Sequence, residues 1–164
     1  MLDTNTLDYI YAKKAHLVPK LRNLSKEHIH LYITHIQQDE INKMTEDKKN
    51  CINKIISMIG IKRILTSCGI IGEQSKHGFI GSNIGMYELV DDDVDIPILE
   101  KLRTYTDSNP MGNAADLSIL YTAIKKKMHY LITNDKEFGQ LWQKISKFIP
   151  NDLQVQKNDY LDSL

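Results

Sequence analysis

Four acidic residues lie at positions in the sequence where a carboxylate needs a partner. Asp3 and Asp135 each follow a short apolar run, at the point where a buried strand is expected to end. Glu40 and Asp116 lie three or four residues from apolar residues on two expected helices. Each acid is therefore expected on the side of its helix that packs against the rest of the protein. A lone ionised carboxylate is costly on such a helix face, so Glu40 and Asp116 each require a partner or a metal ion.

Taken singly, Glu40 and Asp116 also have ordinary structural interpretations. Asp116 opens its helix, where an acidic side chain stabilises the helix N-terminus by roughly 0.3–1 kcal/mol. Glu40 could form a partly buried salt bridge with a lysine. The combination of four acids is more specific, because carboxylates held close together repel one another unless cations offset them. Sites that offer only oxygen ligands suit hard ions such as Mg²⁺ or Mn²⁺.

The elements that must position these acids alternate between strands and helices. In the first half we expect a very short strand before Asp3, a helix through Ala15, an amphipathic helix over 25–44 with an apolar stripe at Ile29, Ile33 and Ile36, and a helix that ends at Gly60. The glycine-rich segment 67–85 predicts a loop or an irregular hairpin. In the second half we expect helices over 96–106, 113–127 and 140–146, and strands over 129–133 and 153–156.

This alternation predicts an α/β fold with a largely parallel sheet. The crossovers between parallel strands are right-handed, so the carboxyl ends of the strands open onto one edge, where ligands bind in such sheets. We therefore expect Asp3 and Asp135 to face the same crevice, although almost the whole chain separates them.

The composition is that of one ordinary globular domain over residues 1–164, with 26% charged and 41% apolar residues. The sequence has no leader pattern and no apolar run near the roughly 18–20 residues that a membrane span needs, so we expect a cytoplasmic protein with no membrane partner. Cys51 and Cys68 form no CxxC motif and are expected to be small buried residues in a reducing compartment. The 21 basic and 21 acidic residues cancel, so net charge neither favours nor excludes a nucleic-acid partner.

Four segments, in this order, resemble the hallmark segments of the PIN domain family. They are "LDTNTL" at 2–7, "THIQQDEI" at 34–41, "AADLSILYTAI" at 114–124 and "YLITNDKEF" at 130–138. The resemblance extends over nearly the whole chain, whereas the glycine-rich segment has no counterpart in the family.

The resemblance implies a three-layer α/β/α sandwich with a central, mostly parallel twisted sheet, and the activity of a metal-dependent nuclease that acts mostly on RNA. It makes Asp3, Glu40, Asp116 and Asp135 the catalytic ligands of Mg²⁺ or Mn²⁺, and Asn5 and Thr133 the supporting polar residues. Many PIN domains are toxins of VapC-type toxin–antitoxin pairs. The resemblance therefore also implies single-stranded RNA as substrate, an antitoxin protein as partner and a homodimer.

The chemistry of the acids agrees with such a nuclease. Hydrolysis of a phosphodiester needs a deprotonated water, stabilisation of charge on the phosphoryl oxygens and help for the leaving oxygen, and one or two divalent ions can supply all three. We expect Asp3, Asp116 and Asp135 to hold the principal ion, and Glu40 to bind a second ion or to orient the water. By analogy with the family, the products would carry 5′-phosphate and 3′-hydroxyl ends.

Three other functions compete with this interpretation. A phosphatase of the haloacid-dehalogenase type would need a second acid two residues after Asp3, where this chain has Asn5. His28 and His35 could share a helix face, but no third zinc ligand has suitable spacing. The main alternative is a non-catalytic PIN module that binds RNA or a partner protein. Such modules usually lack one or more of the acids, whereas this chain has all four.

Overall fold

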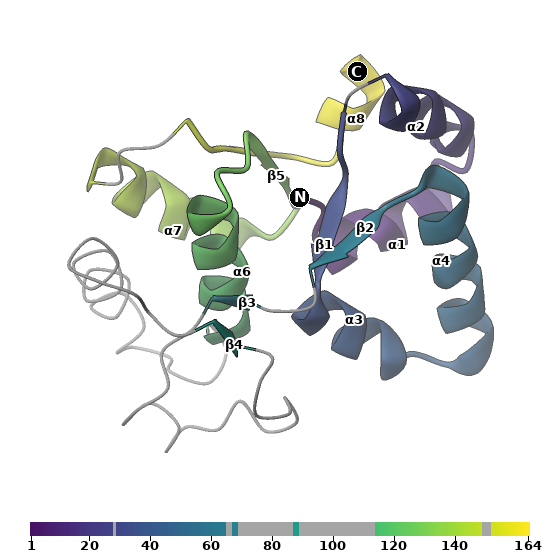
Figure 1. Ribbon diagram of the computed structural model, residues 1–164, viewed down its shortest axis with the longest axis horizontal. Coiled ribbons are helices and arrows are strands. Elements are labelled where there is room, and N and C mark those ends of the chain that lie inside the picture. The colour runs from purple at the N-terminus through teal and green to yellow at the C-terminus, as the bar shows by residue number, and fades with distance from the viewer. Residues whose placement is uncertain (28, 65–66, 69–86, 89–113, 149–151) are drawn as a thin grey trace.

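The computed structural model describes residues 1–27, 29–64, 67–68, 87–88, 114–148 and 152–164 (Figure 1). The helices are α1 (Thr4–Lys13), α2 (Leu17–Lys26), α3 (His35–Asn42), α4 (Glu46–Ile59), α6 (Ala114–Lys125), α7 (Lys136–Ile145) and α8 (Tyr160–Ser163), with a 3-10 turn at Ser146–Phe148. The strands are β1 (Tyr32–Thr34), β2 (Lys62–Ile64), β3 (Ser67–Cys68), β4 (Tyr87–Glu88), β5 (Tyr130–Ile132) and β6 (Gln154–Gln156). The predicted α/β character is confirmed. The predicted helix over 96–106, His28 and most of the glycine-rich segment lie outside the described residues.

All the strand pairs that the structure describes are parallel: β1 with β2, β3 with β4, and β5 with β6. The first three residues of the chain join two of these pairs. The amide of Leu2 donates to the carbonyl of Tyr32 at 2.8 Å, and the amide of Asp3 donates to the carbonyl of Ile132 at 3.0 Å. Residues 1–3 therefore lie between β1 and β5, where the N-terminus is marked in Figure 1.

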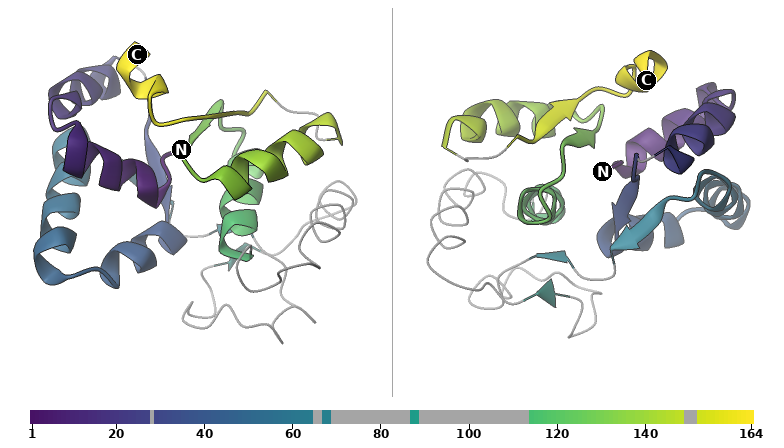
Figure 2. Two further views of the ribbon diagram at one scale, coloured as in Figure 1. Left: turned by 180° about the vertical axis from the view of Figure 1, so that it is seen from behind. Right: turned by 45° about the horizontal axis from the view of Figure 1, so that its top comes forward.

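Side chains that alternate along these extended segments enter two separate hydrophobic clusters. Met1 and Leu131 pack with side chains of α6 and α7, whereas Leu2 and Ile132 pack with side chains of α1, α2 and α4. Alternation with a period of two is what a strand with apolar contacts on both faces produces. The right-hand view of Figure 2 shows the same division, with α6 and α7 on one side of the N-terminal segment and α1, α2 and α4 on the other.

One expected helix is wrong. The segment 25–44 is divided into the end of α2, the strand β1 and the helix α3. The spacing of Ile29, Ile33 and Ile36 imitates a helical stripe, but Ile29 is 38% exposed, and Ile33 is a fully buried residue of β1. The second helix begins only after Thr34, because Thr34 and Gln37 form a capping box that fixes the helix start at that point.

Other expectations hold. The helix before Gly60 ends there as predicted, and Gly60 adopts a left-handed φ of 82°, which glycine reaches without steric cost. The helix, strand, helix and strand expected between 113 and 156 are present as α6, β5, α7 and β6. Cys51 departs from prediction, because its side chain is exposed on α4. Within the described ranges, no helix combines the length and apolar character that a membrane span requires.

Candidate functional site

Two of the predicted acids belong to junctions between a parallel strand and the helix that follows it, and a third lies further along such a helix. Asp3 ends the N-terminal extended segment and is the N-cap of α1. Asp135 follows β5, and its Oδ1 accepts a hydrogen bond from the amide of Phe138 at 3.1 Å in the first turn of α7. Glu40 lies on α3, which begins directly after β1. Because the strands are parallel, these junctions lie toward one end of the strands.

The carboxylate of Asp3 is surrounded by hydrogen-bond donors. Its Oδ1 accepts from the amide of Thr4 at 2.7 Å. Its Oδ2 accepts from the side-chain amide of Asn5 at 2.5 Å and from the hydroxyl of Thr133 at 2.7 Å. Asn5 and Thr133, the two predicted supporting residues, therefore both contact the first acid.

Thr133 links Asp3 to Asp135. The residue is 3% exposed, and its hydroxyl donates to Asp3 and accepts from the side-chain amide of Asn5 at 2.9 Å and from the amide of Asp135 at 3.0 Å. A hydroxyl has one proton and two lone pairs, so these three contacts use its full hydrogen-bonding capacity. The proton of Thr133 is thereby directed at Asp3, and the backbone of Asp135 is held beside it.

Glu40 reaches the same place from α3. Its Oε2 accepts a short hydrogen bond from the hydroxyl of Thr4, whose backbone amide already binds Asp3. The prediction that Glu40 lies on the inward side of its helix is thus met by a contact with α1. Thr4 connects the acid of the N-terminal segment with the acid of α3.

Charge repulsion and burial act together on these acids. Burial raises the pKa of Asp3, and the neighbouring charge of Asp135 adds to the increase, although the hydrogen bonds from Thr133 and Thr4 oppose it. Burial also raises the pKa of Glu40, with a further contribution from Asp3, against the hydrogen bond from Thr4 and the charge of Lys43. The hydrogen bonds through Thr4 and Thr133 bring Glu40 and the backbone of Asp135 close to Asp3.

Asp116 is carried by a different element, the helix α6. It lies half-buried in the first turn of α6, which fits its expected place at the start of that helix. The helix leads through residues 126–129 into β5, so helix and strand run in opposite directions (Figure 1). The first turn of α6 therefore lies toward the carboxyl end of β5, the end from which Asp135 follows.

The structure adds residues that the sequence did not single out. Gln37 is fully buried; its side chain accepts from the amide of Thr34 and donates to the carbonyl of Leu2, both at 2.6 Å. It therefore ties α3 to the segment that carries Asp3. The T-x-x-Q pattern of Thr34 and Gln37 is a capping-box signature from which this residue could have been identified.

A second set of hydrogen bonds supports the residues around Asp3. The buried side chain of Asn158 lies 2.7 Å from the hydroxyl of Thr6, and its backbone amide donates to Asn134 at 3.0 Å. The amide of Asn134 donates in turn to the side chain of Asn5, also at 3.0 Å. The turn after β6 is thereby fastened to the residues around Asp3. No sequence pattern marks Asn158 for this role.

The donors of the site fit a hard divalent ion in their chemistry. Asp3, Glu40, Asp116 and Asp135 offer only carboxylate oxygens, which suit Mg²⁺ or Mn²⁺ better than zinc. A positive charge near Asp3 and Glu40 would also favour their ionised forms against the effects that raise their pKa values. In the ranges that the structure describes, however, no three His, Cys, Asp or Glu side chains are grouped closely enough to hold a metal ion.

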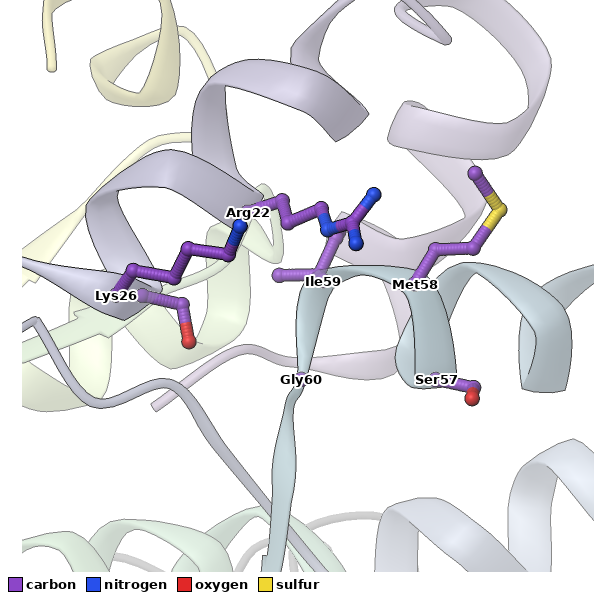
Figure 3. A pocket seen from close by; sticks show the side chains of 7 residues that line it. Arg22, Lys26, Ser57, Met58, Ile59 and Gly60 are labelled. Carbon is purple, nitrogen blue, oxygen red and sulfur yellow. The ribbon is translucent and has the colours of Figure 1, made fainter.

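A cavity of about 350 Å³ lies elsewhere in the molecule (Figure 3). It is lined by the last turns of α2 and α4, with Arg22, Lys26 and Met58 among its side chains. These helices end just before β1 and β2, so the cavity lies toward the amino ends of those strands. None of the four acids lines it.

Comparison of the chain with models of known protein families, with curated protein sequences and with solved structures gave no match.

Proposed function

We propose that this chain is a metal-dependent ribonuclease of the PIN type, which hydrolyses phosphodiester bonds in single-stranded RNA. The observation that supports the proposal best is the hydrogen-bonded arrangement of Asp3, Glu40 and Asp135. Asp3 and Asp135 come from strand-to-helix junctions, and Glu40 comes from α3. Thr4 binds the carboxylates of both Asp3 and Glu40, and Thr133 binds the carboxylate of Asp3 and the backbone amide of Asp135. Such connected, mutually repelling carboxylates are uncommon in a part of a fold that has only a structural role.

The proposed fold is a three-layer α/β/α sandwich formed by residues 1–164 as a single domain. Its central sheet would have the order β2, β1, residues 1–3, β5, β6. The support for this sheet is the hydrogen bonding of residues 1–3 to both β1 and β5, and the two hydrophobic clusters that alternate side chains enter. An antitoxin partner and a homodimer stay predictions from the resemblance.

Asp3, Glu40, Asp116 and Asp135 would hold one or two Mg²⁺ or Mn²⁺ ions. A bound ion would stabilise negative charge on the phosphoryl oxygens and help to deprotonate the attacking water. The chain's own contribution is to keep the carboxylates in place. Asn5 and Thr133 fix Asp3, and the first turn of α7 fixes Oδ1 of Asp135.

The proposal is tested by incubating the protein with single-stranded RNA and Mn²⁺ or Mg²⁺ and following cleavage. Asp3→Asn, Asp135→Asn and Glu40→Gln are each expected to lower kcat/KM by more than about 100-fold, beyond what the loss of a supporting hydrogen bond usually causes. Asp39→Asn is the matched control, because it neutralises the neighbouring acid on the same helix and should leave cleavage unchanged. Equal cleavage by the wild type and the three site variants would refute the assignment.

A second candidate function is a non-catalytic module that binds RNA or a partner protein. One observation favours it: the described acids do not form a group of three spaced as metal ligands. Metal titration separates the two functions. A ribonuclease should bind Mn²⁺ and lose this binding in Asp3→Asn, whereas a binding module should bind RNA equally well with and without divalent ions.

A further inference from the structure

Thr4 is the residue that contacts two of the proposed metal ligands at once. Its backbone amide donates to Oδ1 of Asp3 at 2.7 Å, and its hydroxyl donates to Oε2 of Glu40. The first contact lies within the start of α1, whereas the second crosses from α1 to α3, two helices that contact each other. One side chain therefore sets where Glu40 lies relative to Asp3.

The hydroxyl of Thr4 has no other structural task in the start of α1. The N-cap of this helix is Asp3, whose carboxylate accepts a hydrogen bond from the amide of Thr4. The hydroxyl of Thr4 is therefore not used for capping. The contact with Glu40 is thus an additional feature at a position where many residue types would permit the helix to begin.

Without this hydroxyl, the side chain of Glu40 would be able to adopt other conformations. Its side chain is long and flexible, it is repelled by Asp3, and it is attracted by Lys43 one helical turn further along. Lys43 is exposed, so its pull is toward solvent. The hydrogen bond from Thr4 opposes both effects and holds Glu40 near Asp3.

We propose that Thr4 is a positioning residue of the metal site: its hydroxyl holds Glu40 beside Asp3, so that both carboxylates serve the same divalent-ion centre. The inference rests on the proposed function and adds to it a residue outside the predicted set. Thr4 would act through Glu40 and would not itself be a ligand of the ion.

The test measures Mn²⁺ binding by titration calorimetry without RNA, for the wild type, Thr4→Val and Thr4→Ser. Thr4→Val keeps the backbone amide and the shape but removes the hydroxyl, and it should weaken Mn²⁺ binding about tenfold, as loss of a supporting contact to a metal ligand typically does. Thr4→Ser keeps the hydroxyl and should bind within about twofold of the wild type. Thr45→Val, an exposed position before α4, is the control for the substitution itself.

A double variant keeps the inference testable if Thr4→Val also affects folding. In a Glu40→Ala background, Thr4→Val should cause no further loss of Mn²⁺ affinity, because the acceptor of the contact is already absent. Wild-type affinity in Thr4→Val, equal losses in the valine and serine variants, or additive losses in the double variant would overturn the inference. Absence of Mn²⁺ binding in the wild type would instead overturn the proposed function, and the inference with it.

Discussion

Removal of the Thr133 hydroxyl should destabilise the protein in a way that depends on the ionisation of Asp3. Thr133→Val keeps a β-branched side chain of similar volume in a buried position at the end of β5. It deletes the donor to Oδ2 of Asp3 at 2.7 Å and the acceptor for the side chain of Asn5 at 2.9 Å and the amide of Asp135 at 3.0 Å. The fold itself should persist, because β5 pairs with β6 through backbone groups.

The expected loss follows from these three contacts. A hydrogen bond to an ionised group contributes about 1.5–3 kcal/mol and a neutral one about 0.5–1.5 kcal/mol, and such contributions are not additive among neighbours. Asn5 and Asp135 lie nearer solvent and can recover part of their hydrogen bonding from water. We therefore expect Thr133→Val to lower the free energy of unfolding by about 2–4 kcal/mol at neutral pH. Thr133→Ser should lower it by only about 1 kcal/mol through loss of a buried methyl group.

The pH dependence identifies the contact with Asp3. The hydrogen bond from Thr133 lowers the pKa of Asp3 against the larger effect of burial, so it stabilises the ionised form. Its contribution is therefore present while Asp3 is ionised, and it decreases as the pH falls through the pKa of Asp3 in the folded protein. The deficit of Thr133→Val relative to the wild type should thus be larger at pH 7 than at about pH 4.

Urea unfolding at both pH values measures this difference, with Thr6→Val as control. Thr6 is also a buried threonine near the site, but its hydroxyl lies beside a backbone carbonyl and an asparagine, which do not titrate. Its deficit should be the same at both pH values. An equally pH-independent deficit in Thr133→Val, or a loss no larger than that of Thr133→Ser, would refute the assigned role of the hydroxyl.

Three further predictions concern stability. Asn158→Ala should lower the free energy of unfolding by about 1–3 kcal/mol in urea titrations, because it leaves buried partners unsatisfied, whereas the exposed neighbour Lys157→Ala should have little effect. Asp3→Asn should raise the thermal midpoint of unfolding at neutral pH. Burial raises the pKa of Asp3, so the carboxyl group of Asp3 contributes to stability at acid pH. This contribution is lost as the pH rises through the pKa of Asp3 in the folded protein. The gain should vanish below about pH 4, and a gain independent of pH would contradict this reasoning. Gly60→Ala should cost about 1–2 kcal/mol from the left-handed backbone alone, since the added Cβ would lie 3.5 Å from Ser25 in ordinary contact, and an unchanged urea midpoint would contradict it.

The sequence was sufficient for the elements whose ends carry strong local signals. Gly60 ends α4 because glycine adopts a positive φ, and β5 stops where an apolar run meets polar residues before α7. β1 was missed because three residues are too few to show a period-two pattern. In addition, the isoleucines on either side of β1 imitate a helical stripe.

The contacts within the site were harder to predict than the acids. Thr4 and Glu40 are 36 positions apart, and Asn158 is 152 positions from Thr6. Such pairs depend on how the strands are ordered, which no local pattern specifies. Asn5 and Thr133 could be identified only because a resemblance placed them, whereas Gln37 could be identified from its capping box.

The pKa values of Asp3 and Glu40 are raised because burial and neighbouring negative charge outweigh the hydrogen bonds that favour the ionised forms. This excess bears on function. Asp3 accepts hydrogen bonds from Thr4, Asn5 and Thr133, an arrangement that should favour the carboxylate, yet burial and the charge of Asp135 outweigh the donors. If the donors served stability alone, a neutral side chain at position 3 would serve better, because it would avoid burial of a charge. A divalent ion can recover the free energy that the ionised acids cost the folded state, since it stabilises the charged forms. Mn²⁺ should therefore stabilise the wild type against unfolding more than it stabilises Asp3→Asn, and equal stabilisation of the two proteins would show that the acids are buried for another reason.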